Sequence, residues 1–137
     1  MTFQTKHSKI DVALLQLDSA IKAHMENRYI EAITLAGASE EILGAFCKRQ
    51  GLVVAVEEIA KLPVMKKLAS PMFELNRARN CLKHAKESSE DDFEIAQEDD
   101  YVMIVRAIVN LKKLKISPSE TVNEFRDLYK SKEINQE

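Results

Sequence analysis

Residues 98–113 read EDDYVMIVRAIVNLKK, and the spacing of the apolar residues in this stretch is typical of a helix with one buried face. Acidic residues open the stretch and lysines close it, an order that suits the dipole of a helix. The sequence therefore predicts a helix that begins near Glu98. Its expected buried face comprises Tyr101, Ile104, Val105, Ile108, Val109 and Leu111.

Apolar spacing and capping residues indicate helices along most of the remaining chain. Ser8 is expected to cap the first helix, and Gly51 is expected to end the second. Before the last helix, Ser117 is expected to act as N-cap and is followed by a first-turn proline. These helices are predicted over residues 9–26, 29–49, 53–61, 71–86 and 118–130. We therefore expect an all-α fold, a bundle of four main helices plus one or two short helices.

The chain has 137 residues, of which 45% are hydrophobic and 31% are charged, as in an ordinary globular protein. This length suits one domain, which we place over residues 1–130, followed by a frayed tail over residues 131–137. No apolar run is long enough for a membrane span and no signal peptide is recognised, so we expect a cytoplasmic protein without membrane contact. Cys47 and Cys81 lack metal-type spacing and are expected to be buried as small apolar residues. Neither a metal nor a cofactor is expected.

Charge is distributed unevenly along the chain. The net charge of −2 argues against a protein that binds duplex DNA, because such proteins carry a basic face. Residues 61–86 nevertheless contain seven Lys or Arg and one acid, a local net charge of +6. Residues 87–100 then contain eight acids and no base. These acids would repel an RNA backbone bound nearby, unless they fold over the basic block or contact a basic partner.

The three glycines are Gly37, Gly44 and Gly51, seven residues apart, so the first two share one face of their helix. Glycine inside a helix costs about 1 kcal/mol relative to alanine. Two glycines on one face suggest that another backbone packs closely there. The close contact is expected either within the bundle or with a second subunit.

Arg79-Asn80-Cys81-Leu82-Lys83-His84 is the stretch that comes closest to chemistry. Asn80 and His84 are four residues apart and project from the same face of a helix. A guanidinium can hold a phosphate and an imidazole titrates near neutral pH, so the pattern is typical of a site that cleaves phosphodiesters. Arg77 is nearly eclipsed with His84, whereas Arg79 is turned by about 140° from it. Helix geometry therefore favours Arg77 as the partner of His84, unless a second subunit brings its own arginine.

Other residues with reactive or aromatic side chains are assigned to structure. His7 and His24 are expected to be exposed and to have no role. Phe93 and Tyr101 are expected to belong to the core, because residues 101–111 have the periodicity of a buried helix. A metal site made from His84 and the acids of residues 91–94 lacks a recognised spacing.

The run Arg79-Asn80-x-x-x-His84, in the penultimate long helix of a small all-α domain, resembles the signature of the HEPN superfamily (higher eukaryotes and prokaryotes nucleotide-binding domain). In that family an Arg and a His are separated by four to six residues, and Asn often follows the Arg. The resemblance covers the helix order over residues 8–130, but only the hexapeptide is specific. Many HEPN proteins are metal-independent endoribonucleases that pair so that two motifs line one cleft. Others have lost catalysis and bind nucleotides or partner proteins.

The resemblance implies a role for each matched residue. His84 would act as general acid or base toward a ribose 2′-hydroxyl or the leaving 5′-oxygen. Arg79 would stabilise charge that develops on the phosphate, and Asn80 would orient His84 or a phosphate oxygen. The expected products are a 2′,3′-cyclic phosphate and a 5′-hydroxyl. The residues expected to attract RNA are Arg77, Lys83 and Lys86.

Three functions are compatible with these features. The first is a toxin-like endoribonuclease whose composite site lies at the cleft of a homodimer. The second is a catalytically silent HEPN module that binds a nucleotide or a protein partner, such as an antitoxin or a small nucleotidyltransferase. The third is a helical interaction protein without an active site. The first two predict a concave cleft lined by the hexapeptide, and the third predicts a convex surface or salt bridges with the acids of residues 87–100.

Overall fold

This computed structural model describes residues 3–63, 71–83, 92–96 and 98–135. These residues contain six helices. No β-strand occurs among these residues, so the prediction of an all-α fold is confirmed for them. The last helix continues past its expected end near Lys130. The helices are α1 (Lys9–Met25), α2 (Tyr29–Arg49), α3 (Ala55–Ala60), α4 (Pro71–Lys83), α5 (Asp99–Lys113) and α6 (Glu120–Asn135).

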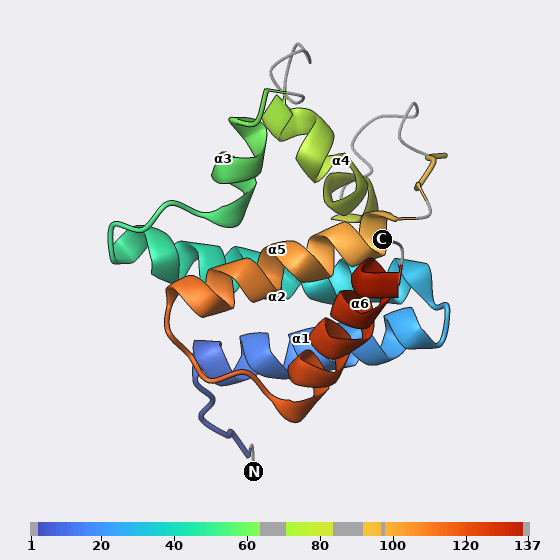
Figure 1. The fold of residues 1–137 in the computed structure, drawn as a ribbon. Coiled ribbons are helices and arrows are strands. Elements are labelled where there is room, and N and C mark those ends of the chain that lie inside the picture. The colour runs from blue at the N-terminus through green and yellow to red at the C-terminus, as the bar shows by residue number, and fades with distance from the viewer. Residues whose placement is uncertain (1–2, 64–70, 84–91, 97, 136–137) are drawn as a thin grey trace.

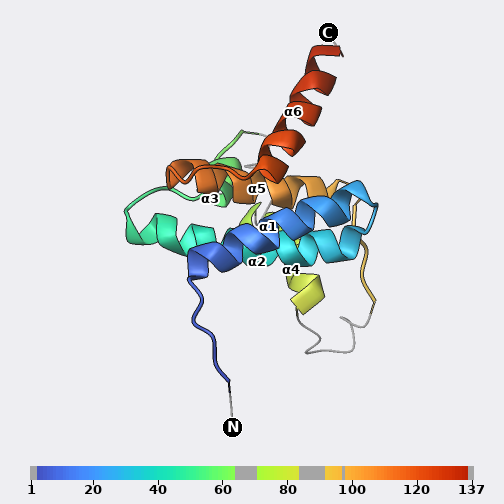
Figure 2. The same cartoon turned by 90° about the horizontal axis from the view of Figure 1, so that it is seen from below.

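Helices α1, α2 and α5 form the centre of the molecule, with α2 packed along both of the others (Figure 1). Helices α3 and α4 lie on the side of α2 and α5 that faces away from α1. Helix α6 begins beside α1 and α5, and its C-terminal end projects away from the other helices (Figure 2). The bundle is therefore built on three central helices, with α4 and α6 attached on different sides.

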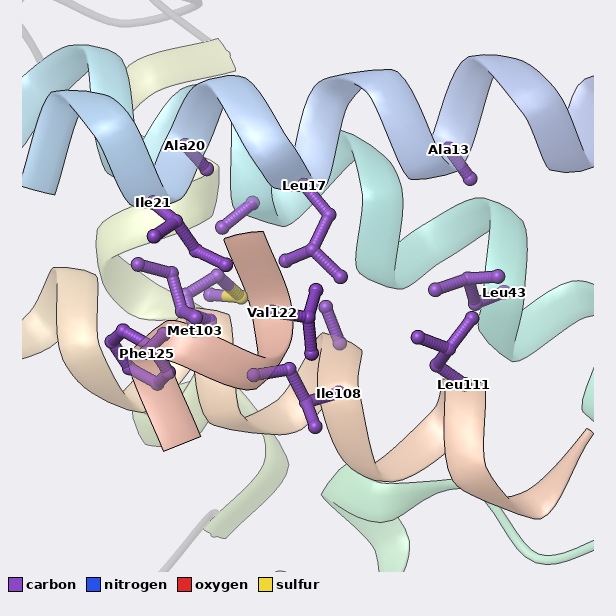
Figure 3. Packing of buried hydrophobic residues seen from close by; sticks show 13 residues of the cluster. Ala13, Leu17, Ala20, Ile21, Leu43, Met103, Ile108, Leu111, Val122 and Phe125 are labelled. Atoms are coloured by element: carbon purple, nitrogen blue, oxygen red, sulfur yellow. The ribbon is translucent and has the colours of Figure 1, made fainter. Parts of the chain in front are cut away.

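The core lies where α1, α2, α5 and the first turns of α6 meet, and Figure 3 shows side chains from all four helices pointing into this space. Leu17 of α1, Leu43 of α2 and Leu111 of α5 are at most 1% exposed. Full burial of each such side chain contributes about 1.5–3 kcal/mol to stability. Val122 and Phe125 bring α6 into the same core.

Helix α5 is buried on more than one side, because α2 and α1 cover one part of it and α3 another. Its predicted apolar face is correct for Ile104, Ile108 and Leu111, which are buried. Two polar residues of the same helix, Arg106 and Asn110, are also completely buried. Asn110 Oδ1 accepts a hydrogen bond from the Ala55 backbone N–H (2.8 Å), and this bond holds the start of α3 against α5.

The caps of the first two helices are as predicted, but the cap of the last one is not. Ser8 Oγ accepts a hydrogen bond from the Asp11 backbone N–H (3.1 Å), and Gly51 has a positive φ of 73° just after α2. The prediction that Ser117 caps the last helix is wrong. Ser119 does so instead, because its hydroxyl accepts from the Val122 N–H (3.1 Å) and donates to Asp18 of α1 (2.6 Å).

Among the residues that the structure describes, no helix is long and apolar enough to cross a membrane.

Candidate functional site

Packing of α4 against the bundle determines which of its arginines points inward. Leu75 packs against the buried cluster formed by Cys47, Val54 and Val56. Arg79 is four residues after Leu75 and therefore shares its face of the helix. Its side chain is only 13% exposed. The inward arginine is thus Arg79, the residue selected by the motif.

Glu40 of α2 binds two arginines in the interior. One carboxylate oxygen, Oε2, accepts a hydrogen bond from Arg79 Nη1 of α4 at 2.7 Å. The other, Oε1, accepts from Arg106 Nη2 of α5 at 3.0 Å. The side chains of Glu40 and Arg106 are 5% and 0% exposed. One buried carboxylate therefore joins three helices, and we call this group the Arg–Glu–Arg cluster.

Arg106 also holds α4 directly. Its Nη1 donates to the backbone oxygen of Leu75 (2.6 Å), and its Nη2 donates to Asn76 Oδ1 (2.7 Å). Burial lowers the pKa of the Arg106 guanidinium, and attraction to Glu40 partly opposes this effect. The side chain of Arg106 therefore determines where α4 lies relative to α5.

The hydrogen bond to Glu40 strongly limits what Arg79 can bind. A second carboxylate, that of Glu41, lies 3.9 Å from Arg79 Nη2 and is also paired with Lys83. The two acids place negative charge directly beside the Arg79 guanidinium, although Glu40 is shared with Arg106 and Glu41 with Lys83. A cavity of about 250 Å³ beside Arg79 is lined by both carboxylates and by Lys48 and Asn76. A phosphate entering this cavity would meet acceptors as well as donors, which disfavours its binding.

The two candidate arginines point to different parts of the molecule. Arg77 Nη1 donates to the backbone oxygen of Glu94 (2.7 Å), and its Nη2 lies 4.0 Å from Asp99. It therefore contacts the segment before α5 and the first residue of α5, although Arg77 lies outside the hexapeptide for which the interaction-protein hypothesis predicted such contacts. Arg79 does not take part in that contact, because its partner is Glu40 of α2.

The remaining residues of the predicted site are only partly placed. Asn80 is half-buried on α4, and Lys83 is exposed. His84 and Lys86 lie outside the described residues. The pair formed by Asn80 and His84 therefore stays a prediction, as do the catalytic and RNA-attracting roles.

Both glycines of α2 face side chains of the same chain. A β-carbon on Gly37 would lie 2.9 Å from Arg79 Cγ, and one on Gly44 would lie 3.5 Å from Asn110 Nδ2. The close approach was expected from a backbone, but it is made by side chains within the bundle. Gly37 allows Arg79 to lie across α2 on its way to Glu40.

Sequence reasoning missed Glu40 and Arg106. Arg106 offered a signal, because it interrupts a helix whose neighbouring residues are apolar and predicted to be buried. A cation in such a position requires a buried partner. Glu40 offered no such signal, because two neighbouring acids on a helix are common on protein surfaces.

The expectation that His24 is exposed and without a role is wrong. Its side chain is 13% exposed, and it lies between a buried carboxylate and a phenol. His24 Nδ1 is 2.5 Å from Asp100 Oδ2, and its Nε2 is 2.5 Å from the Tyr129 hydroxyl. Burial, with Asp100 and Tyr101 nearby, raises the pKa of Tyr129, so this phenol keeps its proton and acts as a hydrogen-bond donor or acceptor rather than as a nucleophile. The three residues thus join α1, α5 and α6.

The expectation that Phe93 belongs to the core is also wrong, because its side chain is 42% exposed. Tyr101 is half-buried and packs against the core, as expected. The difference arises because Phe93 precedes α5 and does not lie on the helical face of which Tyr101 is part.

The fold and the site define an all-α protein in which a buried Arg–Glu–Arg cluster lies under the motif helix. Comparison of the chain with protein-family models, with curated proteins and with solved structures finds no match. The resemblance to the HEPN superfamily therefore rests on the hexapeptide and on the order of the helices.

Proposed function

We propose that this chain is a catalytically silent, HEPN-like helical module that acts by binding a protein partner. The observation that carries this proposal is the ion pair between Arg79 and Glu40, 2.7 Å long and almost completely buried. An arginine that stabilises a phosphate needs donors free to face the substrate. Here the guanidinium is used to hold α4 against α2.

The cost of releasing Arg79 supports the same conclusion. A phosphate that took over the Nη1 donor of Arg79 would displace Glu40, whose carboxylate would then retain Arg106 as a partner but lose Arg79. Breaking a buried ion pair costs about 3–5 kcal/mol, and the displaced carboxylate would repel the incoming phosphate. The module therefore uses its motif arginine for structure, and its function lies in its surfaces.

A second candidate is the metal-independent endoribonuclease, with two copies paired along α4. It is favoured by Arg77 and Lys83, whose side chains are each 35% exposed on the helix that carries the hexapeptide. In this alternative a second subunit would complete the site around Asn80 and His84, and Arg79 would be a positioning residue.

One experiment separates the two candidates. The full chain and a His84→Ala variant, purified in parallel, are incubated for hours in EDTA with a structured RNA labelled at its 5′ end. We expect no cleavage by the wild-type protein above the level of the variant. Circular dichroism checks that both proteins are folded, and a pancreatic-type ribonuclease shows that the RNA can be cut.

Cleavage by the wild-type protein that the variant loses would overturn the proposal and establish the endoribonuclease. A product with a 2′,3′-cyclic phosphate would then identify the chemistry. Equal cleavage by both proteins would not depend on His84 and would therefore agree with the expected result.

A further inference from the structure

An apolar surface surrounds the turn between α1 and α2, and its structure suggests what binds there. Two hollows meet at Tyr29. The first, of about 470 Å³, is lined by Tyr29, Ile30, Phe93, Ile95 and Ala96. The second, of about 550 Å³, includes Met25, Tyr29, Glu98, Tyr101, Leu128 and Tyr129 in its lining. We call the two hollows together the turn surface.

Large hydrophobic side chains are concentrated on the turn surface. Four of them are between 39% and 56% exposed: Met25, Tyr29, Ile30 and Phe93. They come from two segments far apart in the sequence, which Figures 1 and 2 both place at the same end of the molecule. Apolar side chains gathered in this way mark an interaction site more often than isolated ones do.

The turn holds these side chains in place. Asn27 has a positive φ of 62°, a conformation that Asn adopts more readily than most residues. Its side-chain oxygen accepts a hydrogen bond from the Tyr29 hydroxyl at 3.2 Å. Arg28 pairs with both Glu26 and Glu31 on either side of the turn. The surface is therefore largely formed before a partner arrives, which lowers the entropic cost of binding.

The charge around the turn surface is negative. Described residues of the two segments that form it, 24–31 and 92–98, include one arginine, Arg28, and five acids: Glu26, Glu31, Asp92, Glu94 and Glu98. This arginine is already shared between two of these acids. Arg77 of α4 adds a second positive charge beside Glu94, but the charge of the surface stays negative. No lysine or arginine is among the described residues that line either hollow. A complementary partner must combine apolar side chains with positive charge.

We propose that the turn surface binds a basic amphipathic helix of another protein. Apolar residues on one face of that helix, repeated every three or four positions, would enter the hollows on both sides of Tyr29. Its lysines and arginines would face Glu94, Glu98 and the acids of the turn. This inference rests on the proposed function as a binding module, and it names the surface and the chemistry of the partner.

A second copy of this chain is a poorer occupant. A symmetric dimer would place the same turn surface on both sides of the interface. The five acids of one copy would then face the five acids of the other, and like charges across an interface cost several kcal/mol in general, which favours a partner of opposite charge.

The test uses the full chain and a fluorescein-labelled helical peptide of about 18 residues, long enough to form a helix. The peptide carries leucine at positions i, i+3, i+4 and i+7 and lysine on its other face, and a matched peptide has glutamate in place of lysine. Fluorescence anisotropy measures binding. We expect the lysine peptide to bind, to bind more weakly as salt is raised, and to bind far better than the glutamate peptide.

Variants locate the binding site. Ile30→Asp and Phe93→Asp should each weaken binding of the lysine peptide by at least about tenfold, because a carboxylate would be buried in an apolar contact. Leu15→Asp is the matched control, since Leu15 is 71% exposed and lines neither hollow. It should leave binding unchanged. All three positions are exposed, so the variants should keep the wild-type thermal unfolding.

Three results would overturn the inference. The lysine peptide fails to bind, or both peptides bind equally, or the three variants weaken binding to the same extent. A further contradicting result could come from sedimentation. If the wild-type protein is a dimer and the Ile30→Asp variant is a monomer, a second copy of the chain occupies the surface. None of these results changes the outcome of the RNA assay with His84→Ala, so failure of this inference and failure of the proposed function remain distinct.

Discussion

Arg79 lies directly against Gly37, so that a β-carbon on this glycine would lie 2.9 Å from Arg79 Cγ. Gly44, seven residues further along α2, has only ordinary contacts at 3.5 and 3.6 Å. The two glycines share a helix face but differ in what lies against them. Replacing each glycine by alanine should therefore change the stability of the protein differently.

Gly44→Ala should stabilise the protein by up to about 1 kcal/mol, because alanine restricts the unfolded chain and suits a helix better than glycine does. Gly37→Ala should lack this gain, because its β-carbon forces the Arg79 side chain away from Glu40. Urea unfolding measures both changes. In the background of Arg79→Ala the two substitutions should become similar, and a gain at Gly37 equal to that at Gly44 in the wild-type protein would contradict the geometry.

Glu40→Gln should destabilise the protein by about 3–5 kcal/mol, because it leaves the buried charges of Arg79 and Arg106 without their carboxylate. The matched control is Glu41→Gln, a neighbouring acid that is 49% exposed and should change stability by less than about 1 kcal/mol. Urea unfolding measures the difference in the free energy of unfolding, with the same dependence on urea concentration used for both variants. Similar effects of the two substitutions would show that the Arg–Glu–Arg cluster does not hold the fold.

Stability should fall at alkaline pH because of Tyr129. Burial, assisted by Asp100 and Tyr101, raises the pKa of this phenol in the folded protein. A group with a raised pKa contributes stability that is complete below its unfolded pKa of about 10 and is lost as pH rises through the folded value. The free energy of unfolding should therefore decline above about pH 10 in the wild-type protein and decline less in Tyr129→Phe.

The control for this pH series is Tyr29→Phe, a change at an exposed tyrosine that should keep the wild-type slope. At neutral pH, Tyr129→Phe should cost about 0.5–1.5 kcal/mol, because the phenol loses its hydrogen bond to His24. Equal pH slopes in the wild-type protein and Tyr129→Phe would rule out this phenol as the cause.

The two cysteines should differ in reactivity. Cys47 is completely buried, and burial raises the pKa of its thiol although Lys113 opposes this. Cys81 is half-buried on α4, and both thiols are free. Because the thiolate is the reactive form, iodoacetamide at about pH 8 should modify Cys81 first and Cys47 only when the protein unfolds. Mass spectrometry of digested protein measures both rates, and a Cys81→Ser variant that is still alkylated rapidly would contradict the burial of Cys47.

Much of the secondary structure could be predicted because its signals are local. A helix is determined by residues within one turn of each other, so the spacing of apolar residues in 98–113 and the cap at Ser8 were sufficient. The exception at Ser119 shows the limit of this reasoning. Local rules pointed to Ser117, whereas the cap is Ser119, whose hydroxyl also donates to Asp18 of another helix.

The candidate site depended on contacts that no local pattern contains. Whether Arg77 or Arg79 points inward was decided by Leu75, which packs into a cluster that α2 and the start of α3 form. His24 was assigned to the surface because its partners, Asp100 and Tyr129, are 76 and 105 residues away in the sequence. Such pairs form only when whole helices pack together.

The sequence by itself determined that this chain is helical, where most of its helices begin and end, and that one helix carries an Arg-Asn-x-x-x-His motif. Only the tertiary structure decided that Arg79 is held by a carboxylate 39 residues away, beside a cavity that the same carboxylate lines. The physical reason is that helix formation depends on neighbouring residues, whereas a buried charge takes whichever opposite charge the packing of other helices brings to it.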